Sequence, residues 1–538
     1  MNHPRMLAVA VLSVILLGLM AIAQPTLQVE YPASPSSSDS SSRLIRLGPD
    51  DDLQDALNKA VSGDVIELQA GAIYHGPFVL RKHGGPGWVT ITSSTNAQHP
   101  LPPAGVRVTP EHASAMAALV AATGSVISTD PAAARYHFIG VEIRPESRNR
   151  MPDYIAGIRR TITNLVELSA SNNSVQTMPH HIVFERSYLH GDPVQGTRRG
   201  IVMNGAHLAV IDSHLADFKS TEDSQAVAGW EGTGPFLIHN NYLEAAGENL
   251  MFGGADPRVA DRTPSDITIT GNHFSKPLSW QEDHVLHDGS DWSVKNLLEL
   301  KNARRVVIDG NLFEHNWPDS QNGFAILFTV RNQDGKSPWS LVEDVTFSNN
   351  ILRRVAAGIN ILGYDDNYAS GRTQNVRIHN NLFYEIGDDW GSGLLLQLLD
   401  SPADIEFTHN TAMQSAAILS MEGDPVPGMD ISWNVFMENS AGISGTNTGP
   451  GQHSIDTYMK APVTIEGNVL IGAGAAAYPS GVTRVTEFDS LPFIDPPSGD
   501  YRLQDLRGGT FDGFEEIPGV NFGQLCAALS NTDRPLFC

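Results

Sequence analysis

The sequence predicts an all-β chain, a right-handed parallel solenoid with three short strands in each coil and a short N-terminal capping helix. Three observations carry this prediction. One strand-and-turn pattern recurs ten times, a second apolar strand lies in most of the intervals, and no helical pattern separates the strands. A length of 538 residues is long for one compact core, whereas a solenoid grows along one axis by adding coils.

The recurring pattern is clearest in residues 267–274 and 306–313. Both read apolar, polar, apolar, two polar or glycine residues, asparagine, any residue, apolar. Alternation over the first three positions is typical of a strand with one buried face, and Gly-Asn is a turn pair that tolerates positive φ. At intervals of 24 to 39 residues, the asparagine position is filled by Ser187, Ser213, Asn241, Asn272, Asn311, Asn350, Asn381, Asn410, Asn434 and Asn468. Because stacked asparagines can hydrogen-bond to one another along the axis, we interpret this position as a structural ladder.

A second, partly apolar strand is predicted in most intervals. Its copies are residues 201–203, 250–252, 297–300, 325–330, 359–362, 394–399 and 418–421. Intervals of this size match the repeat lengths of solenoids, and β-branched strands without intervening helices exclude leucine-rich and ankyrin repeats.

The chain begins with a segment that predicts export. Residues 1–23 combine Arg5, an apolar run and a small-residue cleavage site at 21–23, which is the pattern of a signal peptide. The alternative is an uncleaved anchor, because the apolar run is near the lower length limit of a membrane span. We expect cleavage, no membrane association afterwards, and a secreted or periplasmic protein. Residues 24–43 form a Pro/Ser-rich linker that cannot bury a core.

The predicted capping helix follows the linker. Residues 50–52 are aspartates that offer N-caps, and Leu53, Ala56, Leu57 and Ala60 recur at helical spacing. A short amphipathic helix would cover the exposed end of a solenoid. We therefore divide the ordered chain into a cap with irregular first coils (44–130), the β-helix (131–485) and a C-terminal cap or tail (486–538).

Charge and cysteine content restrict the partners. A formal net charge of −25 argues against binding nucleic acid through a bulk positive field, and we expect a monomer. The only cysteines, Cys526 and Cys538, could form a disulfide in an exported protein. Two unpaired thiols are the alternative.

Three features together resemble one superfamily. These are the coils with the Ile-x-Ile-x-x-Asn-x-Phe pattern, the helix-then-strand cap at 52–68 and the late segment 493–503. Over about residues 44–510 the chain resembles the right-handed parallel β-helix, pectin-lyase-like superfamily. The resemblance implies the fold but not one activity, because that superfamily holds lyases, hydrolases, epimerases and adhesins.

The longest loops, between Asn241 and Asn381, are where we expect a groove for polysaccharide or a cell-surface glycan. A saccharide needs aromatic faces for its apolar surfaces and polar groups for its hydroxyls. The predicted substrate-binding residues in or beside this window are Trp280, Trp292, Trp317, Trp339, Trp390, Lys295 and His315. The alternative is that the tryptophans cover the apolar surface of the strands.

The most specific group in this window is Glu299-Leu300-Lys301. Leu298 and Leu300 alternate inward, so Glu299 and Lys301 point outward side by side. The resemblance implies lyase chemistry, in which a base removes the proton α to a uronate carboxylate and a cation neutralises that carboxylate. Lys301 is the predicted base and Arg331 the predicted neutralising cation. Glu299, with Asp256 or Asp366, is the predicted holder of Ca²⁺, the one cofactor that we predict.

Other interpretations remain open. Outward charges on solenoid strands often serve only to prevent edge pairing. Hydrolysis would need carboxylates across a cleft, for which the aspartate pairs 365–366 and 388–389 are candidates, but the other hydrolase motifs are absent. The first hypothesis is therefore a uronate-polysaccharide lyase with a groove across residues 240–390. The alternatives are a non-catalytic β-helix that binds carbohydrate or another surface ligand, and a structural or adhesive exoprotein.

Overall fold

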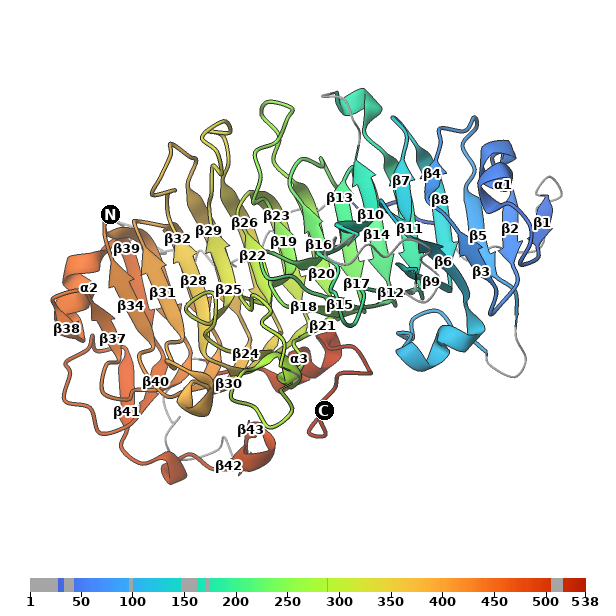
Figure 1. Cartoon of the computed structure of the whole chain (residues 1–538). Helices are drawn as coiled ribbons and strands as arrows, with labels where there is room; N and C mark the ends of the chain where they lie inside the picture. The colour runs from blue at the N-terminus through green and yellow to red at the C-terminus, as the bar shows by residue number, and fades with distance from the viewer. Residues whose placement is uncertain are drawn as a thin grey trace, which may run out of the picture.

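The computed structural model describes residues 28–32, 43–95, 100–146, 162–169, 174–287, 289–504 and 516–538. The predicted signal peptide and most of the predicted linker lie outside these residues. The described strands form three long sheets that run side by side along one axis (Figure 1). This arrangement is a right-handed parallel β-helix, which confirms the predicted fold.

Sheet A has 14 strands, all parallel: β1 (Leu44–Leu47), β2 (Val65–Leu68), β5 (Val89–Ser93), β8 (Ala134–Ile139), β11 (His180–Glu185), β14 (Ala206–Ile211), β17 (Phe236–His239), β20 (Ser265–Thr270), β23 (Ala303–Asp309), β26 (Val342–Ser348), β29 (Thr373–His379), β32 (Ala403–Thr408), β35 (Val426–Ser432) and β39 (Met459–Glu466). Sheet B also has 14: β3 (Ile73–His75), β6 (Ala117–Ala121), β9 (Val141–Pro145), β12 (Tyr188–His190), β15 (His214–Phe218), β18 (Tyr242–Ala245), β21 (His273–Ser275), β24 (Leu312–Asn316), β27 (Ile351–Val355), β30 (Leu382–Ile386), β33 (Thr411–Gln414), β36 (Val435–Met437), β40 (Asn468–Ile471) and β41 (Val482–Val485).

Sheet C has 13 strands: β4 (Phe78–Leu80), β7 (Ile127–Thr129), β10 (Asn164–Ser169), β13 (Arg199–Asn204), β16 (Gln225–Gly229), β19 (Glu248–Phe252), β22 (Leu298–Leu300), β25 (Phe324–Thr329), β28 (Ala357–Leu362), β31 (Leu396–Leu399), β34 (Leu419–Glu422), β37 (Ile443–Gly445) and β38 (Gly449–Pro450). Of these, β38 pairs antiparallel with β37. The second strand that the sequence predicts in most intervals belongs to this sheet.

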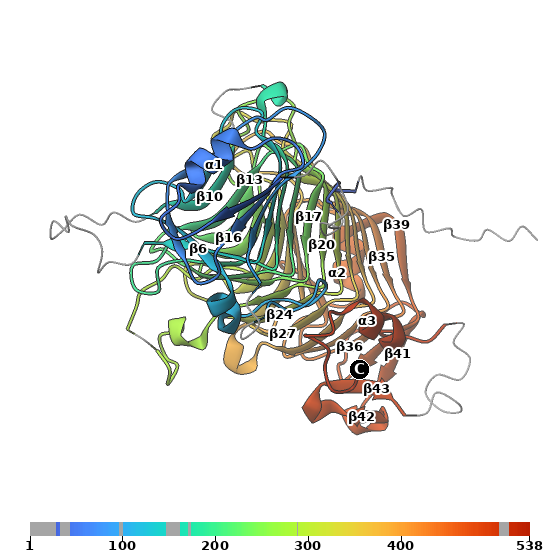
Figure 2. The same ribbon diagram turned by 90° about the vertical axis from the view of Figure 1, so that its right-hand side faces the viewer.

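Each coil passes through sheets A, B and C in turn, as in β17, β18 and β19, and then enters the next coil. Figure 2 shows the coils stacked one behind another, with the C-terminal segment against one side. The stacking keeps equivalent residues in register, so that Ile238 pairs with Ile269 and Ile269 with Ile308. The three sheets begin with β1, β3 and β4, all within residues 44–130. The coils of these residues therefore belong to the same solenoid as those that follow.

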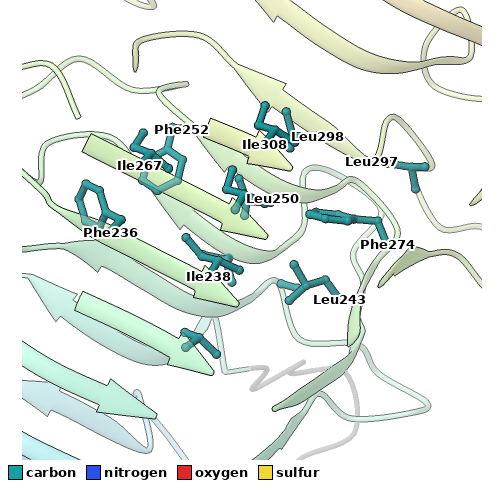
Figure 3. Close-up of a cluster of buried hydrophobic side chains, with 14 of the residues drawn as sticks. Phe236, Ile238, Leu243, Leu250, Phe252, Ile267, Phe274, Leu297, Leu298 and Ile308 are labelled. Atoms are coloured by element: carbon teal, nitrogen blue, oxygen red, sulfur yellow. The ribbon is translucent and has the colours of Figure 1, made fainter. Parts of the chain in front are cut away.

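Apolar side chains from all three sheets meet inside the coils (Figure 3). Ile267 and Ile269 come from sheet A, Phe274 from sheet B, and Leu250 and Leu298 from sheet C, and each is fully buried. Strand alternation explains this core, because every second side chain of each strand must point inward. The driving force is the removal of these side chains from water, worth about 1.5–3 kcal/mol for each large residue.

The asparagine ladder is confirmed as a structural element between sheets A and B. The side-chain oxygen of Asn311 accepts hydrogen bonds from both the backbone N–H and the side-chain amide of Asn272, at 2.9 and 3.0 Å. The Asn311 amide in turn donates to Asn350 and to the backbone carbonyl of Ile269. The residue before each ladder position adopts positive φ, for example Gly310 at 66° and Asn349 at 52°. This explains why Gly and Asn recur there.

The ends of the solenoid are covered as the sequence predicts. Helix α1 (Leu53–Lys59) begins at Asp52, whose carboxylate accepts from the Asp55 N–H. Its four predicted apolar positions, Leu53, Ala56, Leu57 and Ala60, are all buried. Near the other end, α2 (Gln452–Tyr458) follows β38, and β42 (Phe493–Asp495) pairs with β43 (Asp500–Leu503). None of the described helices is long and apolar enough to cross a membrane.

The C-terminal segment returns along the outer face of sheet B. Helix α3 (Phe522–Ala528) packs Leu525 against Leu312 and its neighbours. Arg107 forms a buried ion pair with Asp533 at 2.8 Å. Cys526 and Cys538 form a disulfide with a Cα–Cα distance of 5.4 Å, so the paired alternative is confirmed.

Candidate functional site

Two groups of loops flank the outer face of sheet C. Residues 276–297 connect β21 of sheet B to β22 of sheet C, and residues 330–341 connect β25 to β26 of sheet A. Trp280, Trp292, Trp317 and Trp390 lie in loops of the first group, and Trp339 lies in the second. The predicted aromatic residues are therefore divided between two sides of sheet C.

The tryptophans of the first group pack mainly against one another and against the protein. Trp280 and Trp317 are buried together with Ala246 and Val294, and the half-buried Trp292 and Trp390 lie against this cluster. The ammonium group of Lys219 lies 5.3 and 5.5 Å from the ring centroids of Trp280 and Trp292. Rings buried in this way stabilise the loops. Only the half-buried rings retain a face that could contact a sugar.

The two remaining predicted substrate-binding aromatic residues have protein partners. The His315 ring stacks on Trp390 with centroids 5.6 Å apart, and its Nδ1 lies 3.1 Å from the Ser275 hydroxyl. On the opposite side, Trp339 Nε1 donates to the backbone carbonyl of Arg262. The aromatic groove remains a prediction for Trp292, Trp339, Trp390 and His315.

Glu299 is the centre of the predicted catalytic group. As expected, Leu298 and Leu300 point into the core and Glu299 points outward, yet Glu299 is only 2% exposed. Its carboxylate accepts from Asn296 Nδ2 at 3.2 Å and from Thr329 Oγ1 at 3.3 Å. Lys301 Nζ lies 3.4 Å from Glu299 Oε1. Glu299 therefore holds the base that the sequence predicts in a fixed position on the face of sheet C.

A second charged group lies beside the first. Lys295 Nζ forms ion pairs with Asp223 and, at 3.6 Å, with Glu248 Oε1. Burial lowers the pKa of Lys295, but Glu248 and Asp223 outweigh it, so the pKa is raised and the side chain stays cationic. Burial, with the nearby charge of Glu299, raises the pKa of Glu248. The arrangement thus contains two neighbouring charged groups, one of Lys301 and Glu299 and one of Lys295, Asp223 and Glu248.

Asp223 and Glu248, and the residues that continue their row, are not among the residues predicted from the sequence. Gln225 donates to Glu248 at 2.6 Å, and Arg199 Nε donates to Gln225 at 2.7 Å. Arg199, Gln225 and Glu248 are paired in register on β13, β16 and β19. The available signal was their position: each stands two residues before one of the core residues Ile201, Val227 and Leu250, which are themselves paired in register. Aligning those positions would have placed them in one row.

Arg331 lies on the next coil, as predicted, but its charge is already paired. Its guanidinium forms ion pairs with Asp365, at 2.7 Å, and with Asp366. Its backbone N–H donates to the Lys301 carbonyl at 2.8 Å, which keeps the two residues adjacent. Burial lowers the pKa of Arg331, but the opposite effect of Asp366 and Asp365 is larger, so the pKa is raised overall. In this state Arg331 fixes the 363–372 loop, and neutralising a substrate would require it to exchange a partner.

The three predicted metal ligands have separate partners. Asp256 accepts from the backbone N–H groups of Asp334 and Lys336 and from the Ser337 hydroxyl, so it ties two loops together. Glu299 binds Lys301, and Asp366 binds Arg331. Over the described part of the chain, no group of three or more His, Cys, Asp or Glu side chains is placed to hold a metal ion. The Ca²⁺ requirement stays a prediction.

A buried glutamate beneath the B-to-C loops predicts a pH-dependent stability. Burial raises the pKa of Glu244 from 4.5 to about 7, although Asp217 N–H and Tyr242 OH both donate to its carboxylate. Because the folded state holds this proton more tightly, its stabilising effect is present below the unfolded pKa and is lost as pH rises through about 7. The shift corresponds to about 3 kcal/mol. We expect the free energy of unfolding to fall by about that amount between about pH 4 and about pH 8, and Glu244→Gln to remove that fall. Denaturant titrations of both proteins at both pH values check this. An equal change in the free energy of unfolding with pH in the two proteins would contradict it.

Comparisons with known proteins give the following similarities. A family model described as "Disaggregatase related" matches residues 342–514. No curated protein sequence matches. Among solved structures, a family 6 alginate lyase shares 12% identity over 90% of this chain and 57% of its own, with a TM-score of 0.49. A mannuronic acid specific family 6 polysaccharide lyase from human gut microbiota shares 11% over 82% and 83%, with a TM-score of 0.43. An α-1,3-glucanase from Streptomyces thermodiastaticus shares 12% over 85% and 71%, with a TM-score of 0.43.

Proposed function

We propose that this β-helix binds an acidic polysaccharide across the outer face of sheet C and cleaves it by β-elimination. One observation carries the proposal: two lysines that flank strand β22, Lys295 before it and Lys301 after it, are each held by carboxylates on neighbouring strands and loops. A reaction at the carbon next to a carboxylate needs two cationic or basic groups with different tasks.

The surroundings of the two lysines favour a division of these tasks. Lys295 has a raised pKa because of Glu248 and Asp223, so it is suited to neutralise a uronate carboxylate and unsuited to accept a proton. Lys301 forms its ion pair with one carboxylate, Glu299, and we assign it the role of the base. Arg331 follows Lys301 on the next coil and positions it through the backbone hydrogen bond.

The proposed step balances without a further reactant. Lys301 removes the proton from the ring carbon α to the uronate carboxylate. The electron pair forms a double bond to the neighbouring ring carbon, and the glycosidic oxygen on that carbon leaves and takes up the proton that Lys301 has just accepted. Lys295 stabilises the negative charge that develops on the carboxylate, which is the electrostatic contribution this chemistry needs most.

A second candidate, glycoside hydrolysis, is favoured by one specific observation. Glu248 and Glu299 are both buried on the same face, and the charge of Glu299 contributes to the raised pKa of Glu248. A carboxyl group with a raised pKa beside a second carboxylate is the arrangement that a general acid and a general base require. In that case Glu248 would be the acid.

One experiment distinguishes these functions. The full chain is incubated with a panel of uronate and neutral glycans, with and without Ca²⁺. An increase in ultraviolet absorbance from an unsaturated uronate product supports the lyase. New reducing ends without that absorbance support the hydrolase. No turnover, with saturable glycan binding, would replace both with a carbohydrate-binding protein, and no binding would leave a structural or adhesive role.

A further inference from the structure

A polar pocket lies at the corner between sheets C and A, and none of the lysines of the proposed groove lines it. It has a volume of about 360 Å³. The lining includes His207 from β14, Asp266 from β20, Arg304 and Arg305 from β23, and Arg262 from the loop before β20. Nothing in the proposed lyase or hydrolase reaction uses these residues.

The pocket lies where a row of outward side chains on sheet A is interrupted. His207 stacks on His181 of the preceding coil, with ring centroids 4.2 Å apart. Asp266 lies two coils after His207, and Arg305 of the following coil donates two hydrogen bonds to its carboxylate, at 2.8 and 2.7 Å. Register places Pro235 between His207 and Asp266. Because its short ring carries no polar group, this coil leaves a hollow between two charged or polar neighbours.

Three of the lining residues each carry a buried side-chain nitrogen that has no hydrogen-bond partner among the described residues. These atoms are Arg262 Nε, Arg304 Nε and His207 Nδ1. Leaving a buried donor unsatisfied costs about 1–3 kcal/mol, and more for a charged group. Nearly all buried polar groups have a partner, so three such atoms at one pocket indicate an occupant that supplies acceptors.

The charges of the lining identify the kind of occupant. Three arginines face two aspartates, of which Asp266 is bound to Arg305 and Asp261 is exposed. Arg304 also forms an ion pair, in which its Nη1 lies 3.6 Å from Glu343 Oε1. Its Nε has no hydrogen-bond partner among the described residues. Guanidinium groups bind carboxylate, sulfate and phosphate oxygens through charge-assisted hydrogen bonds. Hydroxyl groups of Thr233, Thr263 and Ser265 also line the pocket.

We propose that this corner pocket is an oxyanion-binding site, in which Arg262 and Arg304 donate to the anion and His207 completes the contact. The anion is either the acidic group of a saccharide or a free inorganic oxyanion. The site is independent of the proposed cleavage reaction, so it would remain in a protein with no catalytic activity.

Isothermal titration calorimetry of the full chain, at constant ionic strength, tests the site with sodium sulfate, sodium phosphate and sodium glucuronate. We expect saturable binding of at least one probe. Arg262→Gln and Arg304→Gln should each weaken it about tenfold or more, since a charge-assisted hydrogen bond contributes at least that factor. Arg377→Gln is the matched control, because Arg377 lies on β29 of the same sheet and is paired with Glu406 instead.

The outcomes separate the two sources and can overturn the proposal. Binding of glucuronate alone assigns the pocket to a saccharide carboxylate, and binding of sulfate or phosphate alone assigns it to a free oxyanion. Equal affinities in the pocket variants and the Arg377→Gln control, or no binding of any probe, would overturn it. Circular dichroism verifies folding, and Arg262→Lys replaces any glutamine variant that does not fold. Lys301→Ala should leave the binding of sulfate and phosphate unchanged, whatever it does to turnover.

Discussion

Lys301→Ala should lower the turnover of an acidic polysaccharide by about 10²–10⁴-fold, the range expected when a general base is removed. The side chain lies 3.4 Å from Glu299 on the face of sheet C, where it contacts solvent with about a fifth of its surface. Its loss removes the proton acceptor without opening the core, since Leu298 and Leu300 remain buried. The measurement is the initial rate of absorbance increase from the unsaturated product, with kcat and KM determined separately.

The matched control for this prediction is Lys336→Ala. Lys336 lies in the adjacent 330–341 loop, is three-quarters exposed and has one distant partner, Asp334 at 3.8 Å. It removes the same charge from the same region, and we expect its kcat to stay near that of the unmodified protein. If both variants lose activity equally, the effect is one of overall charge, and Lys301 is not the base. If Lys301→Ala keeps full turnover, the enzyme stands but its base lies elsewhere.

Asn311→Ala should destabilise the fold by about 3–5 kcal/mol, although the residue lies far from any reacting group. Removing the side chain leaves the backbone N–H of Asn272 and the carbonyl of Ile269 without these partners, and it takes one donor from Asn350. All of these groups are buried. Each buried group left unsatisfied costs about 1–3 kcal/mol.

Urea unfolding followed by circular dichroism measures this loss. Asn360→Ala is the control, because Asn360 lies on the outer face of sheet C and donates a single hydrogen bond to Gln397. Its replacement should cost about 1 kcal/mol or less. Similar losses in the two variants would show that the ladder contributes no more than a surface hydrogen bond.

The coils could be predicted from sequence because each one is encoded locally. Strand alternation fixes which residues point inward, and the turn before Asn272 or Asn311 needs positive φ, so Gly or Asn recurs there. Repetition then makes the ladder visible. Helix α1 follows the same logic, since its cap at Asp52 and its apolar positions lie within ten residues of one another.

The site could be predicted only in part. That Glu299 and Lys301 lie side by side follows from strand geometry, and the structure places them 3.4 Å apart. The partners of Lys295 could not be predicted, because Asp223 precedes it by 72 residues and reaches it only through the stacking of coils. The same holds for Arg331 and Asp365, which are 34 residues apart on successive loops.

By itself, then, the sequence determined the repeating coil, its inward face and its turn ladder, since these depend on interactions within one strand and one turn. Only the tertiary structure decided which outward side chains meet. Coils of 24 to 39 residues are equivalent in the ladder but carry loops of different lengths, and those loops fold back over the sheets. Their packing buried Trp280 and Trp317, paired Arg331 with two aspartates, and brought Arg262 and Arg304 into the lining of one corner pocket.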